Sequence, residues 1–207
     1  MIFIQHRVNT LDDLKKVNCK NGIEVDVRYH KNKLVLHHDP FNHHLHKPIE
    51  LKTLLQHWKN DGPIILNIKT EGIEQMCIDT MQNFKITNWF FLDISMPYMV
   101  KYSLEASKGS IEGFGPENLA VRFSEFEPIE YALSFQGRAE WIWVDCFNIF
   151  PVTSKIYSKI KSANFKLCLV SPELQNHELI QIEEFRSQIK NIRVDAICTK
   201  RPDLWIS

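Results

Sequence analysis

Short apolar runs rich in β-branched and aromatic residues alternate with longer amphipathic stretches along this chain of 207 residues. The short runs are typical of buried strands and the longer stretches of helices. Strands that alternate with helices predict a parallel sheet, and about eight such units are what a (β/α)8 barrel needs. The predicted strands cover residues 2–4, 22–27, 64–66, 89–92, 119–121, 141–144, 167–170 and 196–198, and the predicted helices include residues 71–83, 96–107, 153–163 and 178–189.

Nothing along the chain marks a boundary between domains. It holds no low-complexity segment and no linker rich in Pro, Gly and Ser, so we expect one compact α/β domain, a TIM barrel, over residues 1–207. This length is at the lower limit of the barrel fold, so most connections must be short. A doubly wound open sheet is the alternative, but no glycine-rich turn follows the first strand to indicate a dinucleotide site.

Polar or titratable residues follow nearly every predicted strand. In (β/α)8 barrels the active site gathers at the carboxyl ends of the strands, so these side chains are expected at one rim. Since strand ends are generally polar, any one of Asp93, Asp145, Ser171 and Thr199 is as consistent with an ordinary strand end as with a substrate contact. The full set is His6, Asp26, Asn67, Lys69, Asp93, Arg122, Asp145, Ser171 and Thr199.

Three short motifs in the first forty residues combine two imidazoles, an acidic pair and a guanidinium. Residues 22–27 alternate polar and apolar, so the acidic pair shares one face of a strand. Carboxylate oxygens suit a hard divalent cation, and two histidines suit a general base and a general acid near neutral pH. Solvated carboxylates and unrelated histidines would explain any fragment alone, but the three in order, each at a strand end, indicate an active site. The motifs are His6-Arg7, Glu24-Val25-Asp26 and His38-Asp39.

This order of H-R, E-x-D and H-D resembles the signature of the glycerophosphodiester phosphodiesterase family, within the superfamily of phosphatidylinositol-specific phospholipases C. The likeness continues along nearly the whole chain, at segments similar to the F-D-M-S-x-P, T-R-x-S-E-x-E-P, W-L-D-x-F, S-P-E-L and C-T-D-x-P stations of a bacterial branch. The resemblance implies a hydrolase of lipid metabolism that cleaves a small glycerophosphodiester or a related polyol or sugar phosphodiester. The five segments are residues 91–97, 121–128, 143–147, 170–174 and 198–202.

The resemblance also implies roles for the motif residues. His6 and His38 are expected to act as the acid/base pair on opposite sides of the phosphorus, and Glu24 and Asp26 to hold one divalent cation, Mg²⁺ or Ca²⁺. Family precedent often has a neighbouring substrate hydroxyl attack first, which gives a cyclic phosphodiester that is then hydrolysed. A lyase that releases the cyclic phosphate is therefore an alternative.

Further residues are expected around the phosphate and the alcohol groups. Arg7 fits either a phosphate contact or a structural role in bracing the acidic pair, and Lys69 matches a lysine that meets phosphate in the family. Arg122 would add a second positive charge on the far side of the rim, where Asp93, Asp145 and Trp143 are candidate rim residues. An apolar pocket for the alcohol half of the substrate would be lined by Phe41, Trp143, Phe147 and Phe150.

Two residues depart from the family pattern. The third barrel strand usually reads E-x-K, with the glutamate as a third metal ligand, whereas here Asn67 stands in its place. An amide oxygen still coordinates Mg²⁺ or Ca²⁺, so Asn67 is the candidate third ligand. The site loses one negative charge, so its metal affinity is expected to be weaker or to depend on Asp93 or Asp145. Val8 stands where the family usually has glycine, so the first loop is expected to run differently. These departures leave open a catalytically degenerate barrel that binds a phosphorylated ligand.

Composition narrows the partners and the setting. The 25 basic and 25 acidic residues balance, and no basic stripe with interleaved aromatics appears, so nucleic acid is not an expected partner. No apolar stretch approaches the roughly eighteen residues of a transmembrane span, and no signal-peptide pattern is present, so a cytoplasmic protein is expected. The oligomeric state stays open. The five cysteines form no C-x-x-C pair, which favours reduced thiols.

A histidine-rich stretch follows the third β-prone run and, taken alone, suggests a zinc or nickel site. No cysteine or regular ligand spacing accompanies it, and the family motif accounts for His38 alone, so we interpret the rest as a solvated or substrate-facing loop. His37 is expected to point away from His38 if the strand continues that far. The histidines of this stretch are His37, His38, His43, His44 and His46.

Overall fold

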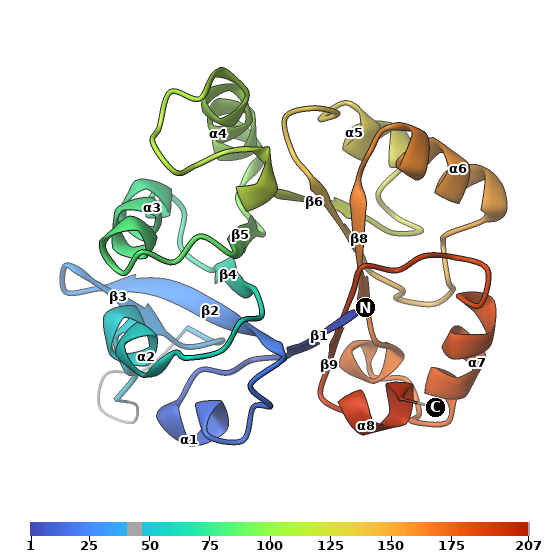
Figure 1. The fold of residues 1–207 in the computed structure, drawn as a ribbon, viewed down its shortest axis with the longest axis horizontal. Helices are drawn as coiled ribbons and strands as arrows, with labels where there is room; N and C mark the ends of the chain where they lie inside the picture. Colours follow the sequence, from blue (N-terminus) through green and yellow to red (C-terminus); the bar gives the residue numbers. More distant parts are fainter. Residues whose placement is uncertain (41–46, 207) are drawn as a thin grey trace.

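The computed structural model describes residues 1–40 and 47–206, and within them eight parallel strands form a nearly closed barrel (Figure 1). The (β/α)8 barrel predicted from the alternating pattern is confirmed. The barrel strands are β1 (Ile2–Gln5), β2 (Gly22–His30), β4 (Ile64–Ile68), β5 (Trp89–Leu92), β6 (Ala120–Phe123), β7 (Trp141–Val144), β8 (Lys166–Val170) and β9 (Ala196–Thr199).

The strands follow one another around the barrel in the order β5-β4-β2-β1-β9-β8-β7-β6. A parallel bridge between Phe91 and Leu119 links the two ends of this order. The third β-prone run of the sequence forms β3 (Lys33–Leu36), which pairs antiparallel with the second half of β2 and therefore lies outside the parallel barrel. Because β3 ends at Leu36, the residues that follow it are free to leave the plane of the sheet.

Helices connect the strands and surround the barrel (Figure 1). Thr10 and Thr153 cap two of them, each by accepting a hydrogen bond from a backbone N–H of the first turn. The helices are α1 (Leu11–Leu14), α2 (Leu51–His57), α3 (Glu74–Asn83), α4 (Met96–Lys108), α5 (Ile129–Leu133), α6 (Ser154–Ser162), α7 (Gln181–Gln188) and α8 (Pro202–Trp205), with two short 3₁₀ helices, η1 (Pro116–Asn118) and η2 (Pro172–Gln175).

Two helices begin later than the sequence pattern predicts. Gly72, at a φ of 88°, cannot belong to a right-handed helix, so α3 starts at Glu74 and not at residue 71. Before α7, the backbone N–H of Gln181 donates to the carbonyl of Glu178, an i→i+3 hydrogen bond typical of a 3₁₀ turn and not of an α-helix. The helix α7 therefore starts at Gln181 and not at residue 178. Among the described residues, no helix combines the length and the apolar character that crossing a membrane requires.

Side chains of the barrel strands alternate between the helices outside and the interior of the barrel. On β2, Ile23, Val25 and Val27 pack into the outer core, whereas Glu24 and Asp26 point inward. Apolar side chains fill the interior beneath these polar groups, and Phe90 stacks on Trp141 there with ring centroids 4.9 Å apart. This inner cluster forms an apolar floor, so the polar side chains at the carboxyl ends of the strands face the open end of the barrel.

Candidate active site

A cavity of about 290 Å³ lies at the carboxyl ends of the barrel strands. Most of the site residues predicted from the sequence line it, and Asp26 is fully buried next to it. Gln175, Phe147 and Leu174 complete the far wall. The predicted residues that line the cavity are His6, Arg7, Glu24, His38, Asn67, Lys69, Asp93, Arg122, Trp143 and Asp145.

The acidic pair of β2 is held by amide groups from two sides. Glu24 accepts hydrogen bonds from the side-chain amide of Asn67 at 2.8 Å and from the backbone N–H of Arg7 at 2.7 Å. Asp26 accepts one from the side-chain amide of Asn9 at 2.7 Å, and its own backbone N–H donates to the Asn9 Oδ1 at 2.9 Å. Both carboxyl groups are therefore fixed in position before any ligand binds.

Two oxygen atoms at this place keep unused bonding capacity. Asp26 Oδ1 and Asn67 Oδ1 are buried without a hydrogen-bond partner, and the Lys69 ammonium lies 3.6 Å from Asp26 Oδ1. Burial, together with the neighbouring charge of Asp26, raises the pKa of Glu24 to about 7. A cation would reduce the repulsion between the carboxylates and would supply a bonding partner to the two oxygens.

The donor atoms fit a hard divalent cation. Within the described part of the chain no three His, Cys, Asp or Glu side chains gather as a metal site, so the amide of Asn67 would have to supply the third oxygen donor. Two carboxylates and an amide oxygen suit Mg²⁺ or Ca²⁺, which prefer oxygen ligands, and lack the nitrogen and sulfur donors that zinc prefers. The assignment of Glu24, Asp26 and Asn67 as metal ligands stays a prediction, with which the oxygen donors present here agree.

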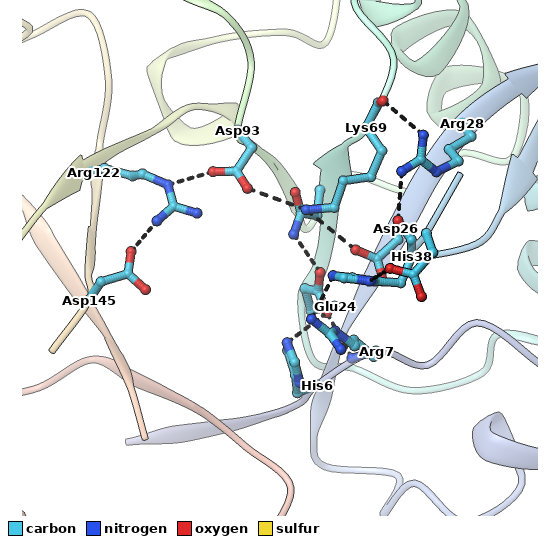
Figure 2. Close-up of polar contacts among 12 residues, drawn as sticks. His6, Arg7, Glu24, Asp26, Arg28, His38, Lys69, Asp93, Arg122 and Asp145 are labelled. Carbon is cyan, nitrogen blue, oxygen red and sulfur yellow. Dashed lines mark hydrogen bonds and ion pairs between the residues drawn. The ribbon is translucent and has the colours of Figure 1, made fainter. Parts of the chain in front are cut away.

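His38 is held on both ring nitrogens. Its Nδ1 lies 2.8 Å from a carboxylate oxygen of Asp39. Its Nε2 lies 2.6 Å from a guanidinium nitrogen of Arg7 (Figure 2). A guanidinium only donates, so Nε2 accepts here and the proton of the neutral ring sits on Nδ1, from which it is donated to Asp39. The Arg7 side chain therefore contacts His38, and only the Arg7 backbone braces Glu24.

His6 lies deeper in the cavity than His38. Its Nε2 is 3.8 Å from a carboxylate oxygen of Glu24, and its Nδ1 is buried without a hydrogen-bond partner (Figure 2). Burial, helped by the positive charges of Arg7 and Lys200, lowers the pKa of His6 to about 3. The ring is therefore neutral at pH 7.

The loop after β1 places His6 through an uncommon backbone conformation. Arg7 has a left-handed φ of 56°, which is rare for a residue with a side chain. Val8, where the family pattern has glycine, is buried, and its N–H donates to the carbonyl of Glu24 at 2.8 Å. The left-handed residue is thus Arg7, and Val8 fills the core under the loop. Such strain is typical of functional sites.

Arg28 of β2 fixes the loop that carries His38. Its guanidinium donates to the carbonyl oxygens of His37 at 3.0 Å, His38 at 2.7 Å and Lys69 at 3.3 Å. His38 lines the cavity and His37 does not, as the sequence predicts. The reason differs from strand alternation, because β3 has already ended and the Arg28 contacts set the path of the loop.

The far wall of the cavity is a chain of ion pairs. Arg122 donates to Asp93 at 2.6 Å and also to Asp145, and Lys69 lies 3.5 Å from Asp93 (Figure 2). Gln175 donates to the second oxygen of Asp145 at 2.8 Å. Burial raises the pKa of Asp145 to about 6, against the opposing effect of Arg122. The charge of Arg122 is thus balanced by two carboxylates, which leaves Lys69 and Arg7 closest to the metal-site residues.

Several candidates named from the sequence lie elsewhere. Ser171 and Thr199 are buried and do not line the cavity, because both hydroxyls donate to Glu173. Phe150 packs against Phe185, with ring centroids 5.8 Å apart, and is likewise absent from the cavity wall. Phe41, His43, His44 and His46 lie outside the described residues.

Sequence reasoning missed three residues that position the site. Asn9, Arg28 and Gln175 each hold a predicted site residue or its loop by hydrogen bonds between segments distant in sequence. Asn9 follows the H-R motif by two residues and Gln175 follows the S-P-E-L segment directly, so their places beside motifs are the only signals in the sequence. Arg28 carries none, because it continues the alternating pattern of β2.

Comparison with models of known protein families gives no match, and neither does comparison with curated proteins. Solved structures do match. A glycerophosphodiester phosphodiesterase from Agrobacterium tumefaciens aligns over the whole of both chains with a TM-score of 0.68 and 13% identity. A glycerophosphoryl diester phosphodiesterase from Parabacteroides distasonis aligns over 99% of this chain and 84% of its own, with a TM-score of 0.66 and 11% identity.

The chain has the fold of these two enzymes. The likeness spans the entire barrel and agrees with the resemblance seen in the H-R, E-x-D and H-D motifs.

Proposed function

We propose that this protein is a phosphodiesterase that depends on a divalent cation and cleaves a small glycerophosphodiester or a related polyol or sugar phosphodiester. One observation carries the proposal: two histidines line one cavity beside a buried pair of carboxylates. The fold of the two matched enzymes supports it. We assign the cation, Mg²⁺ or Ca²⁺, to Glu24, Asp26 and Asn67, where it would neutralise charge on a phosphoryl oxygen.

Arg7 and Lys69 bind the phosphoryl group in this proposal. Among the described residues, the Arg7 guanidinium has the His38 ring as its hydrogen-bonded side-chain partner, so an anionic phosphodiester offers it a stronger, charge-assisted contact. When Arg7 turns to the phosphate, it releases the Nε2 of His38. Lys69 lies between Asp26 and Asp93, at the border of the acidic pair and the far wall.

His6 then acts as the base and His38 as the acid. The neutral His6 removes the proton of the attacking hydroxyl, a new P–O bond forms, and the P–O bond to the leaving alcohol breaks. His38, whose protonated ring Asp39 stabilises through Nδ1, gives its Nε2 proton to the leaving oxygen. If the attacking hydroxyl belongs to the substrate, the product is a cyclic phosphate, and its hydrolysis reverses the two roles.

The experiment compares His38→Ala with His37→Ala. Glycerophosphocholine, glycerophosphoethanolamine and bis(p-nitrophenyl) phosphate are each incubated with Mg²⁺, Ca²⁺ or Mn²⁺. Loss of His38 should lower turnover of the natural diesters by about 10²- to 10⁴-fold. The neighbouring His37 does not line the cavity, so its loss should leave turnover within a few fold.

Two further measurements assign the roles and the reaction. A p-nitrophenolate leaving group needs little protonation, so it should partly rescue His38→Ala and not His6→Ala. Phosphorus NMR distinguishes a cyclic from a ring-opened product and so separates a lyase from a hydrolase. No turnover of any substrate by protein that binds the cation would refute the proposal in favour of a barrel that only binds phosphorylated ligands.

A further inference from the structure

Large apolar side chains are exposed to solvent on the loops beside the cavity. Phe126, on the loop after β6, is 70% exposed, and Ile149 and Phe147, on the loop after β7, are 62% and 36% exposed. The rings of Phe126 and Phe147 lie 6.0 Å apart between centroids. We call these three residues the apolar ledge. Phe126 and Phe147 are in ring contact, and Ile149 follows Phe147 by two residues on the same loop. Exposed apolar side chains that adjoin a cavity mark a candidate binding surface.

The ledge is fixed by hydrogen bonds between its loops. The Glu125 carboxylate accepts hydrogen bonds from the backbone N–H groups of Phe147 at 3.3 Å and Asn148 at 2.5 Å, which ties the two loops together. His177, on the segment after β8, donates to the carbonyl oxygens of Cys146 at 3.2 Å and Phe147 at 2.9 Å. These hydrogen bonds hold the backbone beneath the exposed rings in place. Less conformational entropy is therefore lost when a ligand covers the rings.

The ledge continues the wall of the cavity. Phe147 both lines the cavity and reaches the surface, and Trp143 and Leu174 extend the apolar lining inward. The charges of Arg122 and Asp145 on this side are paired with each other, and they lie across the site from His6, Glu24 and His38 (Figure 2). A ligand with its phosphorus at the histidines that extends toward β7 therefore passes these paired charges and reaches the apolar side chains of Trp143, Phe147 and Leu174.

We propose that the apolar ledge binds a hydrocarbon chain carried by one alcohol group of the substrate, so that the preferred substrate is a single-chain amphiphilic phosphodiester. This inference rests on the phosphodiesterase function proposed above. Three side chains suit one chain and not an extended surface. Glu125 and Glu127 flank Phe126, and their charges oppose an anionic membrane, which favours an amphiphile free in solution.

The test measures kcat/KM along a series from glycerophosphocholine to its 1-hexanoyl, 1-octanoyl and 1-decanoyl derivatives, each below its micelle concentration. Full burial of a methylene is worth about fourfold in affinity, so an open ledge should give roughly a twofold gain per methylene. The double variant Phe126→Ser, Ile149→Ser should flatten the series and leave glycerophosphocholine turnover unchanged. Leu104→Ser, which removes a 39% exposed side chain from α4, is the matched control and should keep the gain.

A second readout does not need turnover. Binding of hexyl-, octyl- and decylphosphocholine, measured by calorimetry, should tighten with chain length in the wild type and not in the double variant. If glycerophosphocholine is cleaved but neither series depends on chain length, the ledge proposal is overturned and the phosphodiesterase function stands. If binding follows chain length but nothing is cleaved, the ledge is a chain site and the proposed reaction fails.

Two other occupants are distinguished by the same variant. Light scattering that finds a wild-type dimer and a monomeric double variant would assign the ledge to a second copy of the chain. Binding to anionic phospholipid vesicles that the double variant loses, with no effect of chain length on soluble substrates, would assign it to a membrane surface. Either result overturns the proposal.

Discussion

Replacing Asn67 by Asp is the sharpest test of the metal site, because the substitution is nearly isosteric and changes only donors and charge. The Asn67 amide donates to Glu24 at 2.8 Å in a fully buried place. An aspartate there would lose that donor and bring a third carboxylate to within about 3 Å of Glu24. It would also restore the charge that the family pattern places on this strand.

Without a cation the variant should be much less stable. Two carboxylates about 3 Å apart repel by roughly 5 kcal/mol at an effective dielectric constant of about 20. Protonating one of them limits this cost, since raising a carboxyl pKa from about 4 to about 7 corresponds to about 4 kcal/mol. For a domain of this size, about 4 kcal/mol lowers the melting temperature by roughly 8–16 °C.

A bound cation should stabilise the Asn67→Asp variant more than it stabilises the wild type. Ligand binding stabilises the folded state by RT ln(1 + [L]/Kd), and a third carboxylate lowers the Kd for a hard cation. Melting temperatures of the wild type and of Asn67→Asp are measured in chelator and in saturating Mg²⁺ or Ca²⁺, with Asn67→Leu as the control that removes the oxygen donor. The cation should raise the melting temperature most for Asp, less for Asn and least for Leu. Equal shifts for all three variants would refute the assignment of Asn67 as a ligand.

Three further predictions concern the same half of the barrel and the cysteines. In chelator, the free energy of unfolding of the wild type, relative to that of Glu24→Gln, should fall by up to about 3 kcal/mol as the pH rises from about 4.5 to about 7, because folded Glu24, with a pKa raised by burial to about 7, holds a proton that the unfolded chain has released. Taking the difference between the two proteins removes the contributions of His6, whose pKa is lowered, and of Asp145, whose pKa is raised. Urea unfolding of both proteins across this range checks the slope of the difference, and saturating Ca²⁺ should abolish the Glu24 contribution. Asn9→Ala should cost about 2–3 kcal/mol of unfolding free energy in urea through its two lost hydrogen bonds to Asp26, and an unchanged midpoint would contradict that bracing role. In the folded protein, a thiol-specific disulfide reagent should modify only Cys19, because the other four thiols are buried and burial raises their pKa.

The fold was predictable because the barrel repeats one simple pattern eight times. Alternation along β2 also placed Glu24 and Asp26 on the inner face without any knowledge of neighbouring strands. Pairing between strands carries no such local signal. The antiparallel position of β3 and the reach of Arg28 to three carbonyl groups depend on segments that meet only in the folded chain.

The charge of Arg122 illustrates the same difficulty at the site. In the sequence it reads as a free cation at a strand end, available to a phosphate. In the fold it lies between Asp93 and Asp145, which are 29 and 23 residues away. Strand order and register decide which charges neutralise one another, and neither is written in the local sequence. A charge therefore becomes a candidate for binding only after its neighbours across the sheet are known.

In this barrel, buried polar atoms without a hydrogen-bond partner indicate the candidate site better than charged side chains do. A buried polar atom without a partner costs about 1–3 kcal/mol, so a fold keeps few of them. Among the described residues, such side-chain atoms are His6 Nδ1, Asp26 Oδ1 and Asn67 Oδ1 in the barrel, and the carboxylate of Glu74 on α3. The three in the barrel come from β2, β4 and the residue after β1, whereas the ionised groups of the far wall are paired. The half of the rim built by the first strands is therefore the half that a cation and a phosphate would complete in the proposed reaction, because the charges of the other half already neutralise one another.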